Sequence, residues 1–208
     1  MIRVKQDADY TYYKAVNTGR MQIVDLKTDL TGNYQNHNLK TILTAVELVQ
    51  NNGFNLPFQQ TLEALTRVKE LTGLRGRWEY LQKEPPVICD VAHNPAGLYE
   101  VLRQLWYVPA HHKHIVLGFV KDKEVEEALK LFPHEAIYYF CNAQIPRALP
   151  ADELFAIATK MGLNGNYYPS VNEAVMAAKH QMTNEDALLI TGSFFVVAEA
   201  MEYSSKIL

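Results

Sequence analysis

Cysteine, excess charge and long apolar runs are all scarce in this chain. Only Cys89 and Cys141 are cysteines among its 208 residues. Both fall in apolar, strand-like runs, which predicts two buried, reduced thiols rather than a disulfide framework. No stretch reaches the roughly 18 apolar residues of a membrane-spanning helix, and the N-terminus lacks the pattern of a signal peptide. We therefore expect a soluble, cytoplasmic protein without a membrane partner.

The charge balance and several missing motifs narrow the function further. The formal net charge is −3, which is too close to neutral for a general nucleic-acid binder, so we expect no nucleic-acid partner. No glycine is followed by lysine. The phosphate-binding loop G-x-x-x-x-G-K-[ST] is therefore absent, and so is the dinucleotide fingerprint G-x-G-x-x-G. The hydrolase motif G-x-S-x-G does not occur either.

The first third of the chain predicts a small β region followed by helices. Residues 10–16 and 21–26 are β-like and flank a hairpin turn at Asn17-Thr18-Gly19. Apolar residues at positions 39, 42, 43, 46 and 49 have helical spacing, and Asn36 or Asn38 is expected to cap this helix. One further helix is expected from the same spacing at Leu62, Leu65, Val68 and Leu71.

The segment Gly73 to Gly76 predicts a domain boundary, because it holds two glycines, follows a helix and precedes a new series of strands. The expected domains are 1–73 and 74–208. Strands are expected at 77–82, 87–90, 114–119, 136–141, 166–168 and 187–191, and helices at 96–106, 122–131, 151–161, 171–182 and 194–202. This alternation predicts an α/β domain whose mostly parallel sheet is covered by helices on both faces.

Polar side chains gather where the strand at 87–90 meets the next helix. Asp90 ends the strand and His93 stands on the turn. Asn94 before Pro95 is a helix-start signal, because the Asn side chain accepts from a free N–H and proline fits the first helical position. Ligands bind at such strand-to-helix corners in open α/β sheets.

A second concentration of polar residues is His-His-x-His at 111–114. No second cluster of metal-ligating residues and no ligating cysteine accompanies these histidines, so we expect no metal site there.

Several separated segments, in this order, resemble the end of the middle domain and the third domain of folylpolyglutamate synthase and dihydrofolate synthase, in the Mur ligase superfamily. They are Gly32-Asn33-Tyr34-Gln35 with Asn38, Gly76-Arg77-Trp78-Glu79 with Asp90-Val91-Ala92-His93-Asn94-Pro95-Ala96-Gly97, Gly118 with Asp122-Lys123, Pro146-Arg147-Ala148, and Gly192-Ser193. Each is a weak signal alone, but together and in order they are specific.

The resemblance implies a Rossmann-like C-terminal glutamate ligase domain over 74–208, preceded over 1–73 by the end of the central ATP-dependent ligase domain. It also implies an enzyme that uses ATP and Mg²⁺ to join glutamate to a folate or dihydropteroate carboxylate through an acyl phosphate. Such an enzyme extends further upstream, where the phosphate-binding loop and magnesium ligands are expected. We therefore expect no catalytic residue in this chain and no ligase activity from it alone.

The resemblance implies contacts with ATP for Asn38, Arg77, Asp90 and His93, and contacts with glutamate for Arg147 and Ser193. The residue types alone leave other readings open, since Asn38, Asp90 and Ser193 could be turn or cap residues and the two arginines could be solvated or surface-paired. In an extended strand Arg77 and Glu79 would share one face. If that strand pairs antiparallel with the strand at 87–90, Arg77 lies near Asp90, and we expect neither residue to be packed in the core.

Two other functions stay open. A peptidoglycan ligase shares the architecture and a related Asp-x-Ala-His strand end, although His93-Asn94-Pro95 and Gly192-Ser193-Phe194-Phe195 fit the folate branch better. A free-standing ligand-binding or interaction domain without catalysis is the other alternative. The choice between dihydrofolate synthesis and polyglutamate extension, and the oligomeric state, are also left open.

Overall fold

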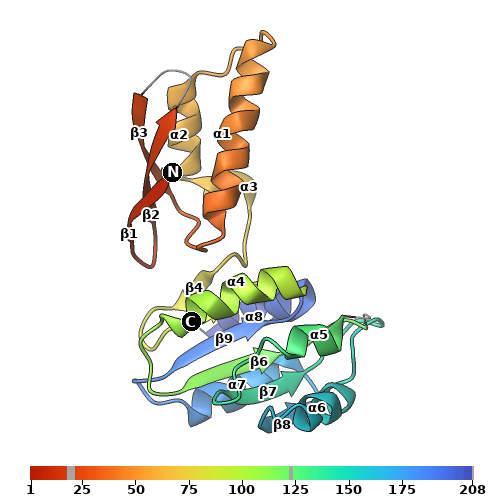
Figure 1. Ribbon diagram of the computed structural model, residues 1–208. Coiled ribbons are helices and arrows are strands. Elements are labelled where there is room, and N and C mark those ends of the chain that lie inside the picture. Colours follow the sequence, from red (N-terminus) through yellow and green to blue (C-terminus); the bar gives the residue numbers. More distant parts are fainter. Residues whose placement is uncertain (18–21, 122–123, 208) are drawn as a thin grey trace. The chain divides into compact units, whose positions relative to one another are not determined.

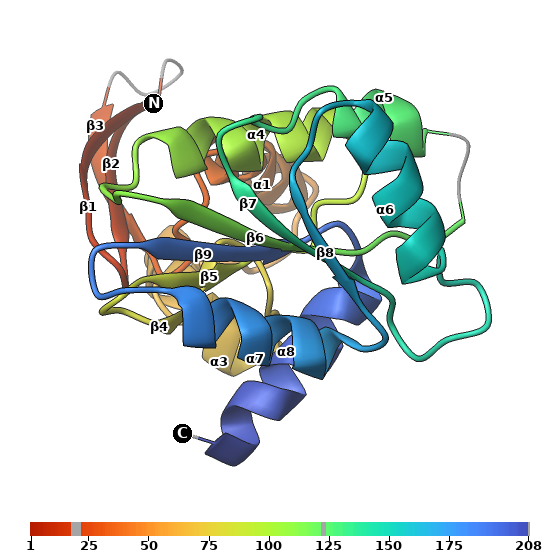
Figure 2. The same ribbon diagram turned by 90° about the horizontal axis from the view of Figure 1, so that it is seen from below.

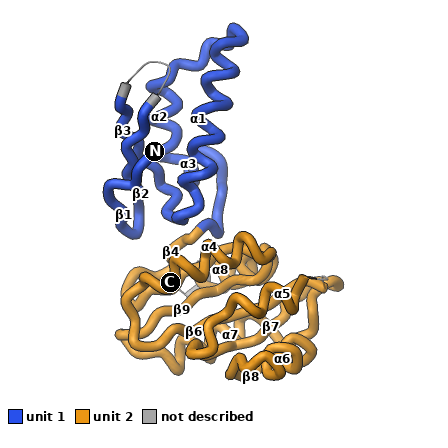
Figure 3. Tube along the Cα trace, in the orientation of Figure 1, with its two compact units in different colours: residues 1–77 blue, residues 78–208 orange. Residues whose placement is uncertain are grey.

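The computed structural model describes residues 1–17, 22–121 and 124–207. The chain divides into two compact units, unit 1 over residues 1–77 and unit 2 over residues 78–208 (Figures 1 and 3). Among the described helices, none combines the length and the apolar character that crossing a bilayer requires. That residues 1–73 are the end of a central ligase domain stays a prediction.

Unit 1 is a small antiparallel sheet packed against helices. The sheet has the order β1-β2-β3. Its core face buries Tyr13 and Leu26 against Leu39 and Leu65 of the helices. The expected turn at 17–19 extends outside the described residues, while the strands on either side of it pair in antiparallel register. The elements are β1 (Ile2–Gln6), β2 (Thr11–Asn17), β3 (Gln22–Thr28), α1 (Gln35–Asn51), α2 (Phe58–Leu65) and α3 (Val68–Thr72).

Two expectations for the helices of unit 1 are wrong. Helix α1 begins at Gln35 after Tyr34, which makes no side-chain cap, so Asn36 and Asn38 lie inside the helix and do not cap it. The single helix expected over 62–71 is two helices. The Asp29 carboxylate accepts from the backbone N–H groups of Val68 and Lys69 at 3.2 and 2.9 Å, and it thereby supplies the acceptors of a new helix start.

Unit 2 is an α/β domain built on a six-stranded sheet of order β4-β5-β9-β6-β7-β8. Only β4 is antiparallel to its neighbour, and the other pairs are parallel. The elements are β4 (Glu79–Gln82), β5 (Val87–Cys89), α4 (Pro95–Trp106), β6 (Lys113–Leu117), α5 (Val125–Leu129), β7 (Ile137–Cys141), α6 (Ala151–Lys160), β8 (Gly165–Tyr168), α7 (Val171–Gln181), β9 (Ala187–Thr191) and α8 (Phe194–Ile207).

Helices cover both faces of this sheet (Figure 2). Helices α4, α5 and α6 lie on one face and α7 and α8 on the other, as expected when crossovers run in opposite directions along the sheet and each is right-handed. The central strands are mostly apolar, because both of their faces are buried. The predicted mostly parallel α/β sheet is confirmed, and so are the two buried free cysteines, Cys89 and Cys141.

Candidate functional site

Strands β5 and β9 are neighbours, and the helices that follow them lie on opposite faces of the sheet. Ligands of open α/β sheets bind outside the carboxyl ends of the strands, where the chain switches direction in this way. We therefore consider the segments that leave β5, β9, β6 and β7 together, and call them the carboxyl edge. It comprises residues 90–94, 191–193, 118–121 and 142–148.

Asp90 is the most enclosed polar group of the first corner, with 2% of its surface exposed. One carboxylate oxygen accepts from the Trp78 backbone N–H at 2.7 Å and the other from the Ala92 N–H at 2.9 Å. Asp90 thus fixes both the turn that follows it and the start of β4. Our expectation that Asp90 lies outside the core is wrong, because the turn folds back over its side chain.

His93 stands exposed on the same corner. Its Nδ1 lies 3.0 Å from the Val91 carbonyl oxygen, and since a carbonyl only accepts, Nδ1 carries a proton and the neutral ring keeps its acceptor at Nε2. The predicted helix start is confirmed: Asn94 accepts from the Gly97 N–H at 2.8 Å and Pro95 opens α4. The turn therefore presents an imidazole beside a capped helix N-terminus.

The second corner joins β9 to α8 through Gly192 and Ser193. Gly192 has φ +101°, and a Cβ there would lie 2.6 Å from the Gly118 carbonyl oxygen, so only glycine fits. Ser193 is buried, and its hydroxyl accepts from the Val196 N–H at 3.1 Å as the expected N-cap. This corner packs tightly against the end of β6.

Arg147 lies on the third corner, the loop after β7. Its carbonyl accepts from the Lys121 N–H, and Leu149 N–H donates to the Phe119 carbonyl, each at 2.9 Å. The loop is thereby tied to the one that follows β6. The exposed guanidinium carbon lies 4.9 Å from the ring centre of Phe195, at the start of α8. Of the resembling motifs, Asp122 and Lys123 lie outside the described residues.

The remaining predicted site residues belong to unit 1. Asn38 lies on α1 and donates to the Gln35 side-chain oxygen at 2.8 Å. Arg77 is the last residue of unit 1, and its side chain contacts the Gly76 carbonyl at 3.4 Å. The structure thus brings Asp90, His93, Arg147 and Ser193 to the carboxyl edge of unit 2.

The strand expected from residue 77 begins instead at Glu79. Trp78 has φ +51°, a left-handed conformation that is uncommon for a bulky residue, and it holds this conformation while its N–H donates to Asp90. The chain is therefore not extended between Arg77 and Glu79, and the shared face expected for these two side chains is wrong. The antiparallel pairing of β4 with β5 is confirmed.

Sequence reasoning missed Thr191, the last residue of β9. Its side chain is completely buried and its hydroxyl donates to the Asp90 carbonyl at 2.8 Å. The only signal in the sequence is a threonine at the end of an apolar run, just before Gly192. Such a residue is ordinary for a strand, and its partner lies 101 positions away.

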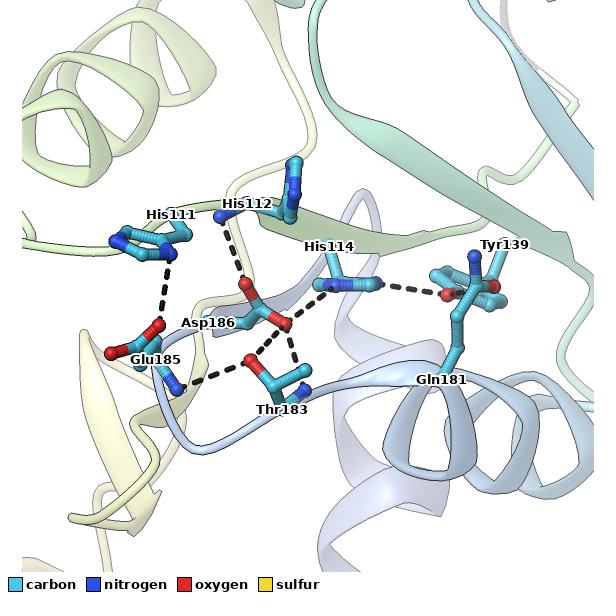
Figure 4. A network of polar contacts seen from close by, with 8 residues as sticks. All are labelled: His111, His112, His114, Tyr139, Gln181, Thr183, Glu185 and Asp186. Carbon is cyan, nitrogen blue, oxygen red and sulfur yellow. Dashed lines mark hydrogen bonds and ion pairs between the residues drawn. The ribbon is translucent and has the colours of Figure 1, made fainter.

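A second polar cluster lies at the opposite, amino edge of the sheet (Figure 4). His114 is buried at the start of β6, with Nδ1 2.9 Å from the Tyr139 hydroxyl, which itself donates to Gln181 at 2.7 Å. Because that hydroxyl has one proton, Nδ1 must donate to it. The other nitrogen, Nε2, makes no hydrogen bond and lies 3.6 Å from an Asp186 oxygen.

The charges of this cluster follow from its surroundings. Burial lowers the pKa of His114 and outweighs the attraction of Asp186, so the imidazole is neutral at neutral pH. Burial also acts to raise the pKa of Asp186, but bonds from the Thr183 N–H and hydroxyl and from the His112 N–H prevail, and the pKa falls to about 2. The cluster joins β6, β7, α7 and β9 and contains no predicted site residue.

A shallow hollow of about 450 Å³ lies elsewhere in unit 2, between the second half of α4 and the segment that enters β7. Tyr99, Trp106 and Leu131 are among its lining residues. None of the predicted site residues is among its lining residues. Among the described residues, no group of three or more histidine, cysteine, aspartate or glutamate side chains could hold a metal ion.

Comparison with known proteins gives this geometry a context. Residues 76–194 match the family model described as Mur ligase, glutamate ligase domain. The chain is 31% identical over 131 residues to the Escherichia coli dihydrofolate synthase/folylpolyglutamate synthase, covering 62% of this chain and 30% of that protein. It is 28% identical over 182 residues to a probable bifunctional folylpolyglutamate synthase/dihydropteroate synthase of Haloferax volcanii, covering 86% of this chain and 21% of that protein.

Solved structures agree with the fold. The chain superposes on E. coli FolC in complex with DHPP and ADP with a TM-score of 0.66 and 25% identity, over 79% of this chain and 38% of that one. It superposes on Mycobacterium tuberculosis folylpolyglutamate synthase complexed with ADP and AMPPCP with a TM-score of 0.66 and 22% identity, over 97% and 48% of the two chains.

The chain therefore spans less than half the length of each of these relatives. The family model covers more than half of the chain and includes both corners of β5 and β9. From these matches and the parallel sheet that carries those corners, we conclude that the chain belongs to the Mur ligase family, through its glutamate ligase domain.

Proposed function

We propose that this chain is the C-terminal part of an ATP-dependent folylpolyglutamate/dihydrofolate synthase, which joins glutamate to a folate or dihydropteroate carboxylate. The observation that carries the proposal is the juxtaposition of two corners: Asp90 to Asn94 after β5, and Gly192-Ser193 after the neighbouring strand β9. The names of its relatives, and the ADP and DHPP in the FolC complex, support this substrate class.

The proposed reaction has two steps. The folate carboxylate attacks the γ-phosphorus of ATP, which releases ADP and leaves an acyl phosphate. The amine of glutamate then attacks the acyl carbon and expels phosphate, which leaves an amide after loss of a proton. The family's chemistry depends on positioning and on charge stabilisation, so the groups on this chain act by binding and orienting the reactants.

Each predicted site residue has a role in this proposal. Arg77 contacts the nucleotide, since a planar guanidinium stacks on a purine or forks onto phosphate. His93 contacts the same nucleotide, and Asn38 contacts the nucleotide base. Asp90 acts on the same ligand indirectly, because its buried carboxylate holds the turn that carries His93. Arg147 supplies a cation to a glutamate carboxylate, and Ser193 and the N-terminus of α8 favour the same charge.

ATP and Mg²⁺ are held mainly by another part of the enzyme in this account. The described residues offer no metal-binding group, and the phosphate-binding loop motif is missing from the sequence. Unit 1, with the three-stranded sheet and helices α1 to α3, is the end of the central ligase domain, and unit 2 is the glutamate ligase domain. The substrates are small molecules, and neither a nucleic acid nor a membrane takes part.

The assay that tests the proposal measures ADP release by the complete ligase that contains this chain. We expect release that requires both glutamate and a dihydropteroate or tetrahydrofolate acceptor, and none from the purified chain alone. The chain is also 27% identical over 130 residues to a Listeria monocytogenes UDP-N-acetylmuramoyl-L-alanyl-D-glutamate–2,6-diaminopimelate ligase, so the acceptor panel includes that UDP-muramoyl compound, supplied with 2,6-diaminopimelate as the amine. Turnover of that acceptor instead of the folates, or turnover by the isolated chain, would contradict the proposal.

A further inference from the structure

Thr191 joins the two corners of the candidate site. Its hydroxyl lies 2.8 Å from the Asp90 carbonyl oxygen and 3.3 Å from the Ala92 carbonyl oxygen. Both carbonyls belong to the turn that carries His93, whereas Thr191 directly precedes Gly192 and Ser193. Because the hydroxyl has one proton, it donates chiefly to the nearer Asp90 carbonyl, with the Ala92 carbonyl as a second, weaker acceptor.

Backbone hydrogen bonds continue the same connection. The Asp90 N–H donates to the Ile190 carbonyl at 3.0 Å, and the Gly192 N–H donates to the Ala92 carbonyl at 3.1 Å. The Ala92 carbonyl thus has two donors within reach, the Thr191 hydroxyl at the end of β9 and the Gly192 N–H in the turn after it. The ladder between β5 and β9 ends at residue 89, so these bonds extend the pairing of the strands into the two functional corners.

The choice of threonine here is informative. Thr191 is completely buried, and burying a hydroxyl is unfavourable unless it is hydrogen-bonded. Valine has nearly the same shape and suits a strand equally well. What the hydroxyl adds over valine is a hydrogen bond to the carbonyls of the turn on which His93 stands.

We propose that Thr191 is a positioning residue, which sets the separation between the nucleotide-facing corner at His93 and the glutamate-facing corner at Ser193. This inference rests on the proposed function. In the second step the amine must meet the acyl phosphate at bonding distance, and a displacement of about 1 Å can cost a hundredfold in rate. A hydroxyl that links the two corners keeps that distance fixed.

The test compares Thr191→Val and Thr191→Ser in the complete ligase. Thr191→Val keeps the shape and removes the hydroxyl, and we expect kcat to fall by tenfold or more. Thr191→Ser keeps the hydroxyl, and we expect kcat within about threefold of wild type. The control is Ile115→Val on the adjacent strand β6, also completely buried, which perturbs packing without touching the connection and should leave kcat unchanged.

A structural readout accompanies the kinetics. Amide hydrogen exchange at Gly192 should be faster in Thr191→Val than in wild type, and unchanged in Ile115→Val. If Thr191→Val does not fold, Thr191→Ser and Thr191→Ala provide the same comparison, because they differ only by the hydroxyl. Equal kcat values for the variants with and without the hydroxyl would overturn the inference.

Two further variants separate this inference from the proposed function. If His93→Ala and Ser193→Ala impair the ligase but removal of the Thr191 hydroxyl does not, then only the positioning role is wrong. If His93→Ala and Ser193→Ala keep wild-type kinetics, then the carboxyl edge is not the ligand site and the inference fails with it, whereas the proposed function fails only if the wild-type ligase does not turn over the folate substrates.

Discussion

At the scale of single residues, three buried polar side chains of unit 2 are hydrogen-bonded to the backbone. Asp90 holds the β5–α4 corner, Asp186 holds the turn that enters β9, and Thr191 connects β9 to the first of these corners. Each has at least one partner that lies 12 or more positions away in the sequence. Residue patterns could therefore predict that Asp90 ends a strand but could not predict that its side chain is enclosed.

Asp90→Asn should lower the free energy of unfolding of unit 2 by about 1–3 kcal/mol, because the new amide NH₂ would face one of the two N–H groups that the carboxylate accepts. Both tryptophans of the chain, Trp78 and Trp106, lie in unit 2, so tryptophan fluorescence during urea denaturation measures this quantity. His93→Ala is the matched control on the same turn. Its side chain is exposed, and stability should stay within about 0.5 kcal/mol of wild type.

The His114 cluster predicts a loss of stability in mild acid. The folded state lowers the pKa of His114 below the ordinary 6.5, so below that pH the unfolded chain binds a proton that the folded chain resists, and stability falls. The Asp186 pKa of about 2 adds a second loss, which begins below its ordinary value of 3.8.

Urea denaturation at about pH 7.5 and about pH 5.5 tests the loss of folding stability that we attribute to His114. Wild type should lose more stability between these conditions than His114→Gln, which cannot take up the proton. His111→Gln is the control, because His111 is exposed and pairs with Glu185 at the surface. Equal pH dependence of wild type and His114→Gln would show that His114 does not carry the effect.

At the scale of elements, local sequence signals predicted most helix and strand positions of unit 2. Asn94-Pro95 marks the start of α4 because the cap and the proline act within one turn. Structural features that depend on residues distant in the sequence could not be predicted. The start of α3 depends on Asp29, and the bend before β4 depends on Trp78 bonding to Asp90. Within the candidate site, the places of Asp90, His93 and Ser193 at strand-to-helix corners could be predicted, whereas the connection through Thr191 required the fold.

Gly192→Ala tests how closely β9 and β6 approach at the carboxyl edge. A Cβ would lie 2.6 Å from the Gly118 carbonyl oxygen, on a backbone with φ +101°. We expect a loss of roughly 1–3 kcal/mol in the stability of unit 2, from backbone strain alone. The control is Gly97→Ala inside α4, where the nearest atom is the Asn94 side-chain oxygen at 3.3 Å and the change should stay within about 1 kcal/mol. Equal losses would contradict the close approach.

At the scale of the whole molecule, the chain consists of two units with separate cores. The family match covers residues 76–194 and so falls almost wholly within unit 2.

Limited trypsin digestion tests this organisation. Arg75 is exposed and Gly73, just before it, has φ +68° at the end of α3, so we expect early cleavage after Arg75 or Arg77. The product should be a resistant fragment that begins close to Trp78. Early cleavage within residues 87–191 would instead contradict a stable unit 2 and with it the two-unit organisation.

The central claim is that the carboxyl edge of unit 2 binds the reactants, and the most direct measurement is the kinetics of Arg147→Met and His93→Ala in the complete ligase. Arg147→Met keeps much of the side chain's apolar stem and removes its charge, so the KM for glutamate should rise by about tenfold or more while the KM for ATP stays unchanged. His93→Ala should raise the KM for ATP or lower kcat by a similar factor. If both variants keep wild-type values for kcat and for both KM values, the carboxyl edge is not the ligand site.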